Sequence, residues 1–275
     1  MPHNLGMNGD PYDTLILSDI HLGSDLSRAQ DALDVLQSHS YRRLVLLGDI
    51  FSDLNFRRLT SEHWKFLSYI RKLSNPKRQV EVVWVEGNHD TGLANLMSHL
   101  VGVPVYERYV WEYEGKRHLA MHGHQFDGFG KKNRWLNRLG ERIFLEIQKV
   151  DSRTKCFSRF LDRLNTRWLL LSDKVARGAI HDARIGKCER VFCGHTHAAL
   201  SLLCDGVEYY NSGSWVDARA TFLTINQHGV EIQIYAGGTH YRHSSAEREP
   251  VVAEVADLFE SAGLPALAGS QSVRC

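Results

Sequence analysis

The chain has 275 residues, of which 43% are apolar and 24% are charged, as in ordinary folded globular proteins. Its 33 Lys and Arg residues nearly balance 32 Asp and Glu residues, which excludes an acidic disordered chain and a uniformly basic one. No apolar run approaches the ~20 residues that span a bilayer, and neither a signal-peptide pattern nor a C-x-x-C pair occurs, so we expect a cytoplasmic protein without an integral membrane segment.

Short apolar runs alternate with helical patterns along most of the chain. Runs typical of buried strands cover residues 14–18, 44–47, 80–85, 119–121 and 191–193, and helical spacing covers residues 28–38 and 61–73. This alternation predicts an α/β sheet core. Two further strands, at 222–225 and 230–235, flank a turn and predict a hairpin. We expect one domain over residues 12–237 and a tail over residues 238–275.

A basic segment interrupts this pattern. Between Asp127 and Arg177, 13 of the basic residues occur against 6 of the acidic ones. Apolar residues at helical spacing predict helices near 135–147 and 157–168, so we expect a helical cap inserted at about residues 127–181. On the second helix, basic residues recur every four positions, and these are Lys155, Arg159, Arg163 and Arg167. They form either a solvated helix face or a surface that binds an anionic, partly apolar substrate.

Polar side chains follow each of the five predicted strands. In α/β sheets, ligands bind beyond the carboxyl ends of strands, so these residues are expected to converge on one site. They are Asp19, His21, Asp49, Asn88, His122, His195 and His197. All are nitrogen or oxygen donors, and their number exceeds what one tetrahedral ion requires. The sequence therefore predicts two metal ions that share a bridging carboxylate.

The ordered motifs resemble those of the calcineurin-like metallophosphoesterase superfamily. They are Asp19-Ile20-His21, Gly48-Asp49, Gly87-Asn88-His89-Asp90, His122-Gly123-His124 and Gly194-His195-Thr196-His197, followed by an N-x-G-S-like turn at 211–214. The resemblance implies a four-layer α/β/β/α sandwich with the helical cap inserted. It also implies a dinuclear phosphohydrolase that uses a metal-bridging hydroxide. The sequence departs from the family's usual G-D-x-x-D motif, because Asp53 stands one position later than the second Asp of that motif.

The resemblance also implies a role for each residue. One metal would be held by Asp19, His21, Asp49 and His197, and the other by Asp49, Asn88, His122 and His195. His89 would be the general acid, Asp90 would orient His89, and His124 would lie near the substrate. Manganese is the leading metal on ligand hardness, with iron and zinc as alternatives.

Within the superfamily, the helical insertion and Met121-His122-Gly123 resemble the UDP-2,3-diacylglucosamine pyrophosphatase branch. Two features depart from that branch, which usually has Arg at the place of His89 and a different sequence at 52–54. The implied substrate is a phosphorylated small molecule or a nucleotide-lipid pyrophosphate. A generic or cyclic nucleotide phosphodiesterase or a nuclease remains an alternative. A different class of alternative is a nucleic-acid binding module or a peripheral module that contacts the inner membrane through the basic cap.

Overall fold

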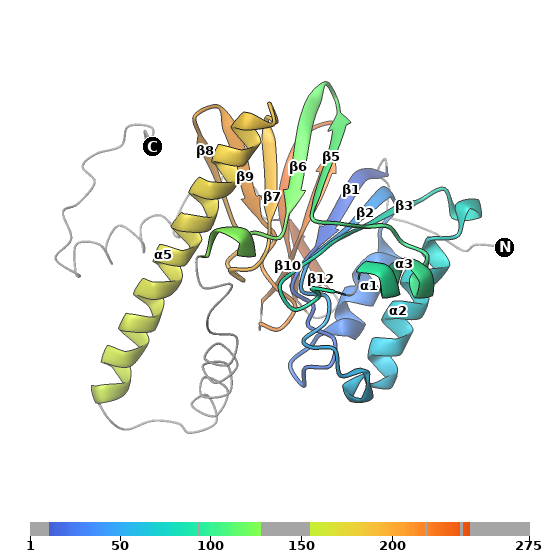
Figure 1. Cartoon of the computed structure of the whole chain (residues 1–275), viewed down its shortest axis with the longest axis horizontal. Helices are drawn as coiled ribbons and strands as arrows, with labels where there is room; N and C mark the ends of the chain where they lie inside the picture. The colour runs from blue at the N-terminus through green and yellow to red at the C-terminus, as the bar shows by residue number, and fades with distance from the viewer. Residues whose placement is uncertain (1–10, 93, 128–154, 218, 237–238, 243–275) are drawn as a thin grey trace.

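The computed structural model describes residues 11–92, 94–127, 155–217, 219–236 and 239–242. Two β-sheets pack face to face and helices cover the outer face of each, so the predicted α/β/β/α sandwich is confirmed (Figure 1). The helices on one side are α1 (Ala29–Ser38), α2 (Ser61–Leu73) and α3 (Ala94–Val101), and α5 (Lys155–Ile185) lies on the other. Short 3-10 turns lie at η1 (Phe56–Arg58), η2 (Pro76–Arg78) and η3 (His124–Phe126).

The first sheet has seven strands in the order β12-β11-β10-β1-β2-β3-β4. They are β1 (Tyr12–Leu17), β2 (Tyr41–Leu47), β3 (Glu81–Val85), β4 (Val105–Tyr106), β10 (Ala220–Asn226), β11 (Gly229–Ala236) and β12 (Thr239–Arg242). β1 to β4 are parallel because a helix crosses over between each pair, whereas β10 to β12 are antiparallel. The predicted hairpin is confirmed. β12 pairs with β11 beyond residue 237, so the sheet continues past the predicted boundary of the domain.

The second sheet has five strands in the order β5-β6-β7-β9-β8. They are β5 (Arg108–Tyr113), β6 (Lys116–Met121), β7 (Arg190–Cys193), β8 (Leu200–Cys204) and β9 (Val207–Asn211). β6, β7 and β9 are parallel, and antiparallel β5 and β8 form the edges. The predicted strands at 119–121 and 191–193 therefore belong to a different sheet from the first three, a division that the alternation pattern did not contain.

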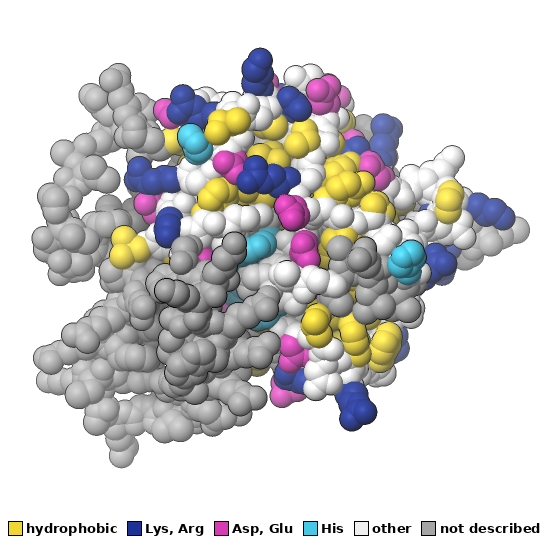
Figure 2. Space-filling view, in the orientation of Figure 1, with side chains coloured by type: hydrophobic (Ala, Val, Ile, Leu, Met, Phe, Trp, Pro, Cys, Tyr) yellow, Lys and Arg dark blue, Asp and Glu magenta, His cyan; other side chains and the backbone are white. Residues whose placement is uncertain are grey.

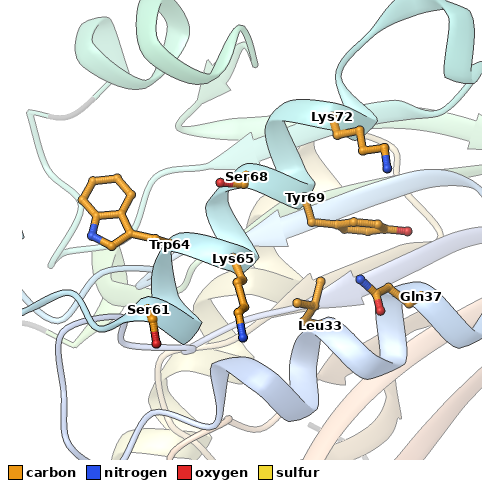
Figure 3. A pocket seen from close by; sticks show the side chains of 8 residues that line it. All are labelled: Leu33, Gln37, Ser61, Trp64, Lys65, Ser68, Tyr69 and Lys72. Atoms are coloured by element: carbon orange, nitrogen blue, oxygen red, sulfur yellow. The ribbon is translucent and has the colours of Figure 1, made fainter.

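The helices on the first sheet form where the periodicity predicted them. α2 spans the predicted range and buries Phe66 and Ile70 against the sheet. Its start is set by Thr60, whose side chain and backbone form a reciprocal capping box with His63. Between α2 and α1 lies a groove of about 600 Å³ (Figure 3). It is lined by Leu33, Gln37, Ser61, Trp64, Lys65, Ser68, Tyr69 and Lys72, none of which is a predicted site residue.

α5 confirms the second helix of the predicted basic segment and extends it. Its later turns, through Val175 and Ala179, pack in a core with Val191 and Tyr209 of the second sheet. The predicted end of the cap at residue 181 therefore falls inside a helix that forms the outer layer of the sandwich. Most of the other predicted cap residues, 128–154, lie outside the described residues, as do residues 243–275 of the predicted tail.

The core between the two sheets contains residues from both, such as Val45 and Val83 from the first and Trp111 and Phe192 from the second. This contact holds the carboxyl ends of β1 to β3 opposite those of β6 and β7. Among the helices of the described residues, none combines the length and the apolarity needed to cross a bilayer.

Candidate metal centre

The five predicted polar clusters follow the carboxyl ends of β1, β2 and β3 in one sheet and of β6 and β7 in the other. Backbone hydrogen bonds join neighbouring loops within each sheet. The Asp19 N–H donates to the Gly48 carbonyl oxygen at 3.0 Å, and the Gly194 N–H donates to the His122 carbonyl oxygen at 3.1 Å. The packing of the sheets then brings the two sets of loops together.

Six of the seven predicted ligands form two compact groups. Within each group, the ligand atoms all lie within 4.8 Å of one another. The groups are Asp19, His21 and His197, and Asp49, His122 and His195. They adjoin, because His122 Nε2 lies 3.4 Å from Asp19 Oδ1 and 3.6 Å from Asp49 Oδ2. In the view of Figure 2, histidine side chains (cyan) lie near the centre of the molecule, next to the residues outside the described ranges.

The seventh predicted ligand, Asn88, follows β3. Its side-chain oxygen Oδ1 is buried and has no hydrogen-bond partner among the described residues. A buried polar atom without a partner is costly, and in native proteins such an atom usually has an ion, a water molecule or a functional reason. Asn88 is next to His89, whose N–H donates to Asp49 Oδ1 at 2.8 Å, so a cation beside Asp49 is a candidate partner for this oxygen and the donor set fits a metal.

The backbone at the ligands is strained. Asp19, His21, Asp49, His195 and His197 all have positive φ, between 50° and 68°. They are five of the nine non-glycine residues with this conformation in the described part of the chain. Such residues cost of order 1–3 kcal/mol each and cluster at functional sites, where the fold pays for their orientation.

Glycines beside the ligands leave room for them. A Cβ on Gly194 would lie 2.4 Å from Asp19 Oδ2, and one on Gly87 would lie 2.2 Å from Asp49 Oδ1. A Cβ on Gly48 would lie 2.4 Å from the His122 ring. Since no side chain fits at these contacts, the glycines allow ligands from different loops to approach one another.

The protonation states suit cation binding. Burial would raise the pKa of Asp19, but its hydrogen bonds and charge interactions with His122 and His197 hold that pKa well below its usual range. Burial lowers the pKa of His122 to about 4 and that of His21 well below 6.5, the latter with help from His197. Neutral imidazoles and ionised carboxylates are the forms that coordinate metals.

Residues 12–199 match the family model described as calcineurin-like phosphoesterase. The chain belongs to the calcineurin-like phosphoesterase family. Its two candidate metal-binding groups consist of aspartate and histidine residues that belong to the motifs of the sequence resemblance. No curated protein gives a significant match to the chain.

Solved structures similar to this phosphoesterase are distant. A Vps29 single mutant from Entamoeba histolytica is 15% identical, with a TM-score of 0.47, and the match covers 84% of this chain and 96% of that one. YfcE, a phosphoesterase from E. coli, is 16% identical over the same shares, also with a TM-score of 0.47. A structure described as a novel archaeal phosphodiesterase is 12% identical, with a TM-score of 0.44, over 81% of this chain and 99% of that one.

His89 lies beside the centre, but not in the predicted arrangement with Asp90. His89 Nε2 is 3.9 Å from Asp49 Oδ2, and the other ring nitrogen, Nδ1, lies 2.6 Å from the Ser52 carbonyl oxygen. Asp90 is fully buried and accepts hydrogen bonds from the Ile50 and Phe51 N–H groups instead. The prediction that Asp90 orients His89 is therefore wrong, because a backbone carbonyl already occupies that ring nitrogen.

Ile50 and Phe51 belong to the loop that carries Asp49, and their N–H groups donate to Asp90. Asp90 therefore supports the shape of that loop. Burial raises the pKa of Asp90 to about 7, against the opposing effect of the two N–H donors. Asp53, the displaced acidic residue of the motif, pairs with Arg58 at 2.9 Å.

His124 and a residue that the sequence did not single out, Asp127, border the second group. His124 Nδ1 lies 3.3 Å from His122 Nδ1. Burial lowers the pKa of His124 to about 3, so it is neutral at pH 7. Asp127 Oδ2 lies 3.0 Å from His195 Nε2. The only signal for Asp127 in the sequence is its place three residues after His124, at the start of the basic segment.

The predicted substrate residues of the basic segment lie on α5. Arg159, Arg163 and Arg167 fall within the helix, as their spacing requires, but their side chains are outside the described part of the structure. The helical prediction is confirmed for this stretch, and a role in substrate binding stays a prediction.

The N-x-G-S-like turn fixes the loop between β7 and β8. The side-chain amide of Asn211 donates to the Gly194 carbonyl oxygen at 2.7 Å and to Thr196 Oγ1 at 3.1 Å. The Trp215 N–H, just past the turn, donates to the Asp19 carbonyl oxygen at 3.0 Å. The turn therefore links the strained loop of His195 to that of Asp19 without contributing a metal ligand.

Proposed function

We propose that this calcineurin-like phosphoesterase is a metal-dependent phosphohydrolase with a dinuclear centre that cleaves a phosphoester or pyrophosphate bond. The observation that carries the proposal is the convergence of two adjoining groups of three candidate ligands, supported by the buried Asn88 oxygen that has no partner among the described residues. Family membership favours the same class of reaction.

The proposed ligand sets share Asp49. Asp19, His21 and His197 would complete one site, and Asn88, His122 and His195 would complete the other. Two divalent cations bound there would supply a hydroxide nucleophile at neutral pH and neutralise charge on the phosphoryl oxygens. The oxygen and imidazole donors make manganese our first choice, with iron and zinc as alternatives.

His89 is the proposed general acid. Since Nδ1 lies 2.6 Å from the Ser52 carbonyl oxygen, it carries one proton, and Nε2 is the atom that faces Asp49. To act as a general acid the ring must be doubly protonated, with the second proton on Nε2, which would pass it to a leaving oxygen and leave the neutral Nδ1–H ring. The ring is also held edge-on to His21, with their centroids 5.2 Å apart. The fixed ring therefore places Nε2, and not the nitrogen that is bound to Ser52, beside the proposed reacting groups.

The proposed substrate is a nucleotide-lipid pyrophosphate of the UDP-2,3-diacylglucosamine type. The basic spacing along α5 supports this, because a helix with regular positive charge and an apolar stripe suits a ligand with phosphates and acyl chains. The same surface would bring the protein to the inner membrane from the cytoplasm. Other phosphodiesters, including cyclic nucleotides and nucleic acid, are the competing substrates.

A substrate panel tests the proposal. Purified full-length protein is assayed with an aryl monoester, an aryl diester, a cyclic nucleotide and UDP-2,3-diacylglucosamine, with manganese, with zinc and with a chelator. We expect metal-dependent turnover that chelation abolishes, and a loss of more than about 100-fold in Asp49→Ala, since losing a shared ligand exceeds the usual effect of an outer-shell change. Release of uridine monophosphate would support the lipid substrate, whereas turnover of the diesters alone would replace it.

His89 is tested within the same panel. His89→Asn should reduce kcat about 100-fold or more on an ester with a poor leaving group and much less on an aryl ester, which leaves without protonation. Equal turnover of both esters in this variant would remove the role of His89. Absence of metal-dependent turnover throughout the panel, together with binding of anionic vesicles or nucleic acid, would favour a binding module instead.

A further inference from the structure

Asp127 holds a position that the proposed function does not use. Asp127 is buried, and its carboxylate lies 3.0 Å from Nε2 of His195, a residue of the second ligand group. Asp127 is not a member of that group, whose ligand atoms lie within 4.8 Å of one another. It therefore contacts a candidate ligand from outside the group, at Nε2 of His195, which leaves Nδ1 as the nitrogen that would coordinate an ion.

A histidine has two ring nitrogens, and only one can coordinate a given ion. A carboxylate that accepts the N–H of the other nitrogen fixes both the tautomer and the orientation of the ring, and it raises the basicity of the coordinating nitrogen. His195 needs such support more than most residues, since its backbone is in the left-handed conformation with a φ of 68°. Its ring also packs edge-on against His122, with centroids 5.1 Å apart.

Asp127 is held in turn by contacts between η3 and α5. The turn starts at Gly123, whose φ of 107° requires glycine, and the Phe126 N–H donates to the Gly123 carbonyl oxygen at 3.1 Å. Phe126 packs directly on α5, because a Cβ on Gly178 would lie 2.4 Å from its ring. Figure 1 shows this short turn between α5 and the end of β6. The position of Asp127 therefore depends on a close contact between a turn and a helix of the outer layer.

We infer that Asp127 is a positioning residue for the second metal site. Asp127 orients His195, and the turn that carries Asp127 is held against α5 by the contact between Phe126 and Gly178. The inference rests on the proposed dinuclear centre. It predicts that the second site weakens when Asp127 is removed, and also when this contact is disturbed at Gly178, which touches no ligand. α5 is the helix that carries the basic residues of the proposed substrate surface, so substrate binding and the second metal site would share one structural element.

The test measures metal binding, independently of turnover. Metal-free full-length protein is titrated with Mn²⁺ by calorimetry, and electron paramagnetic resonance distinguishes a spin-coupled pair of ions from single ions. Asp127→Ala should bind the second Mn²⁺ about 10- to 100-fold more weakly and lose the coupled signal at limiting metal, with the first site unchanged. Asp127→Asn should fall between it and the wild type, because an amide oxygen can still accept the His195 N–H. Gly178→Ala should weaken the second site in the same direction.

The control is Asp53→Ala, which removes a carboxylate bonded to Arg58 at 2.9 Å outside both ligand groups and should leave both sites intact. Wild-type binding of two ions with an unchanged second site in Asp127→Ala would overturn this inference and leave the proposed function standing. Wild-type protein that binds fewer than two ions would overturn the dinuclear centre itself. If Asp127→Ala does not fold, Asp127→Asn and Gly178→Ala decide, and wild-type affinity in both would overturn the inference.

Discussion

At the amino ends of the strands, cationic side chains lie against anionic ones, whereas at the carboxyl ends carboxylates and imidazoles face one another. At the amino ends, Arg43 pairs with Glu81 at 2.8 Å, and Arg190 and Lys116 both pair with Glu208, at 3.0 and 2.8 Å. At the carboxyl ends, Asp19 and Asp49 share His122, whose Nε2 lies 3.4 Å from Asp19 and 3.6 Å from Asp49, and Asp19 also lies 3.3 Å from His197. At the amino ends, acidic side chains are neutralised by Lys and Arg of the same chain. At the carboxyl ends, carboxylates and imidazoles gather in an arrangement that could hold a cation.

The contrast extends to the backbone. The charged residues of the amino ends lie in regular strands, while five ligands at the carboxyl ends have positive φ. Strain and unpaired donors are expected where a fold gives up stability for function. One residue of the amino half departs from this comparison. His118 is fully buried beside Trp111 and Phe192, and neither ring nitrogen has a hydrogen-bond partner among the described residues.

The largest effect should come from a side chain added where the loops at the carboxyl ends approach one another. Gly194→Ala places a Cβ 2.4 Å from Asp19 Oδ2 and 2.7 Å from Ser18, so Asp19 must move. Because misplacing a reacting group by about 1 Å can cost 100-fold, we expect at least that loss of metal-dependent turnover, together with loss of bound metal by elemental analysis. Gly186→Ala is the control, since its nearest contact would be 3.4 Å. Full activity in Gly194→Ala would mean that the close approach of Gly194 to Asp19 at the carboxyl ends is not needed for the metal centre.

An intermediate effect should come from His118, the exception. Burial lowers its pKa to about 4, so folding favours the neutral ring, and the stability that this provides above pH 6.5 is lost as the pH falls toward 4. By pH 5 the loss is about 2 kcal/mol of unfolding free energy. His118→Leu should remove this loss, as measured by urea unfolding at pH 7 and pH 5, because no partner is left unsatisfied. His228→Gln, in an exposed turn, should keep the wild-type slope. An unchanged slope in His118→Leu would show that a partner satisfies the ring.

The smallest effect should come from the paired charges. Burial would raise the pKa of Glu208, but Lys116, Tyr210 and Arg190 lower it to about 2, so its stabilising effect is present above pH 4.5 and fades as the pH falls toward 2. Glu208→Gln should lower the unfolding free energy by about 1 kcal/mol at pH 7 and by less at pH 4, as measured by urea unfolding. Glu112→Gln, on an exposed position of β5, should have no effect. A difference independent of pH would mean that the pairing is not electrostatic.

The elements that the sequence predicted are those with a local signal. α2 coincides with the predicted range because its apolar spacing and its capping residues lie within the same segment. The convergence of six of the seven candidate ligands could be predicted because each follows an apolar run, and parallel strands place their carboxyl ends at one edge. His118 could have been placed inside by the same reasoning, since it alternates with Ala120 on a strand that is buried on both faces.

The residues that support the ligands had no such signal. The partner of His89 is the carbonyl of Ser52, and a backbone oxygen is the same at every position, so no residue type marks it. Asp90 stood next to His89 in the sequence but reaches the loop of Asp49 instead. Asp127 contacts His195 across 68 residues, and α5 touches its turn through a glycine.

The sequence by itself determined which residues bear lone pairs, where the main strands and helices lie, and that a dinuclear site was the simplest use of seven such donors. The division into two sheets, the joining of the basic segment to the outer layer and the partner of each imidazole were decided only by the tertiary structure. The physical reason is range. Periodicity and capping act over a few neighbouring residues, whereas the orientation of a ring depends on atoms far away in the sequence, such as Ser52 for His89 and Asp127 for His195, which only the folded chain brings within about 3 Å.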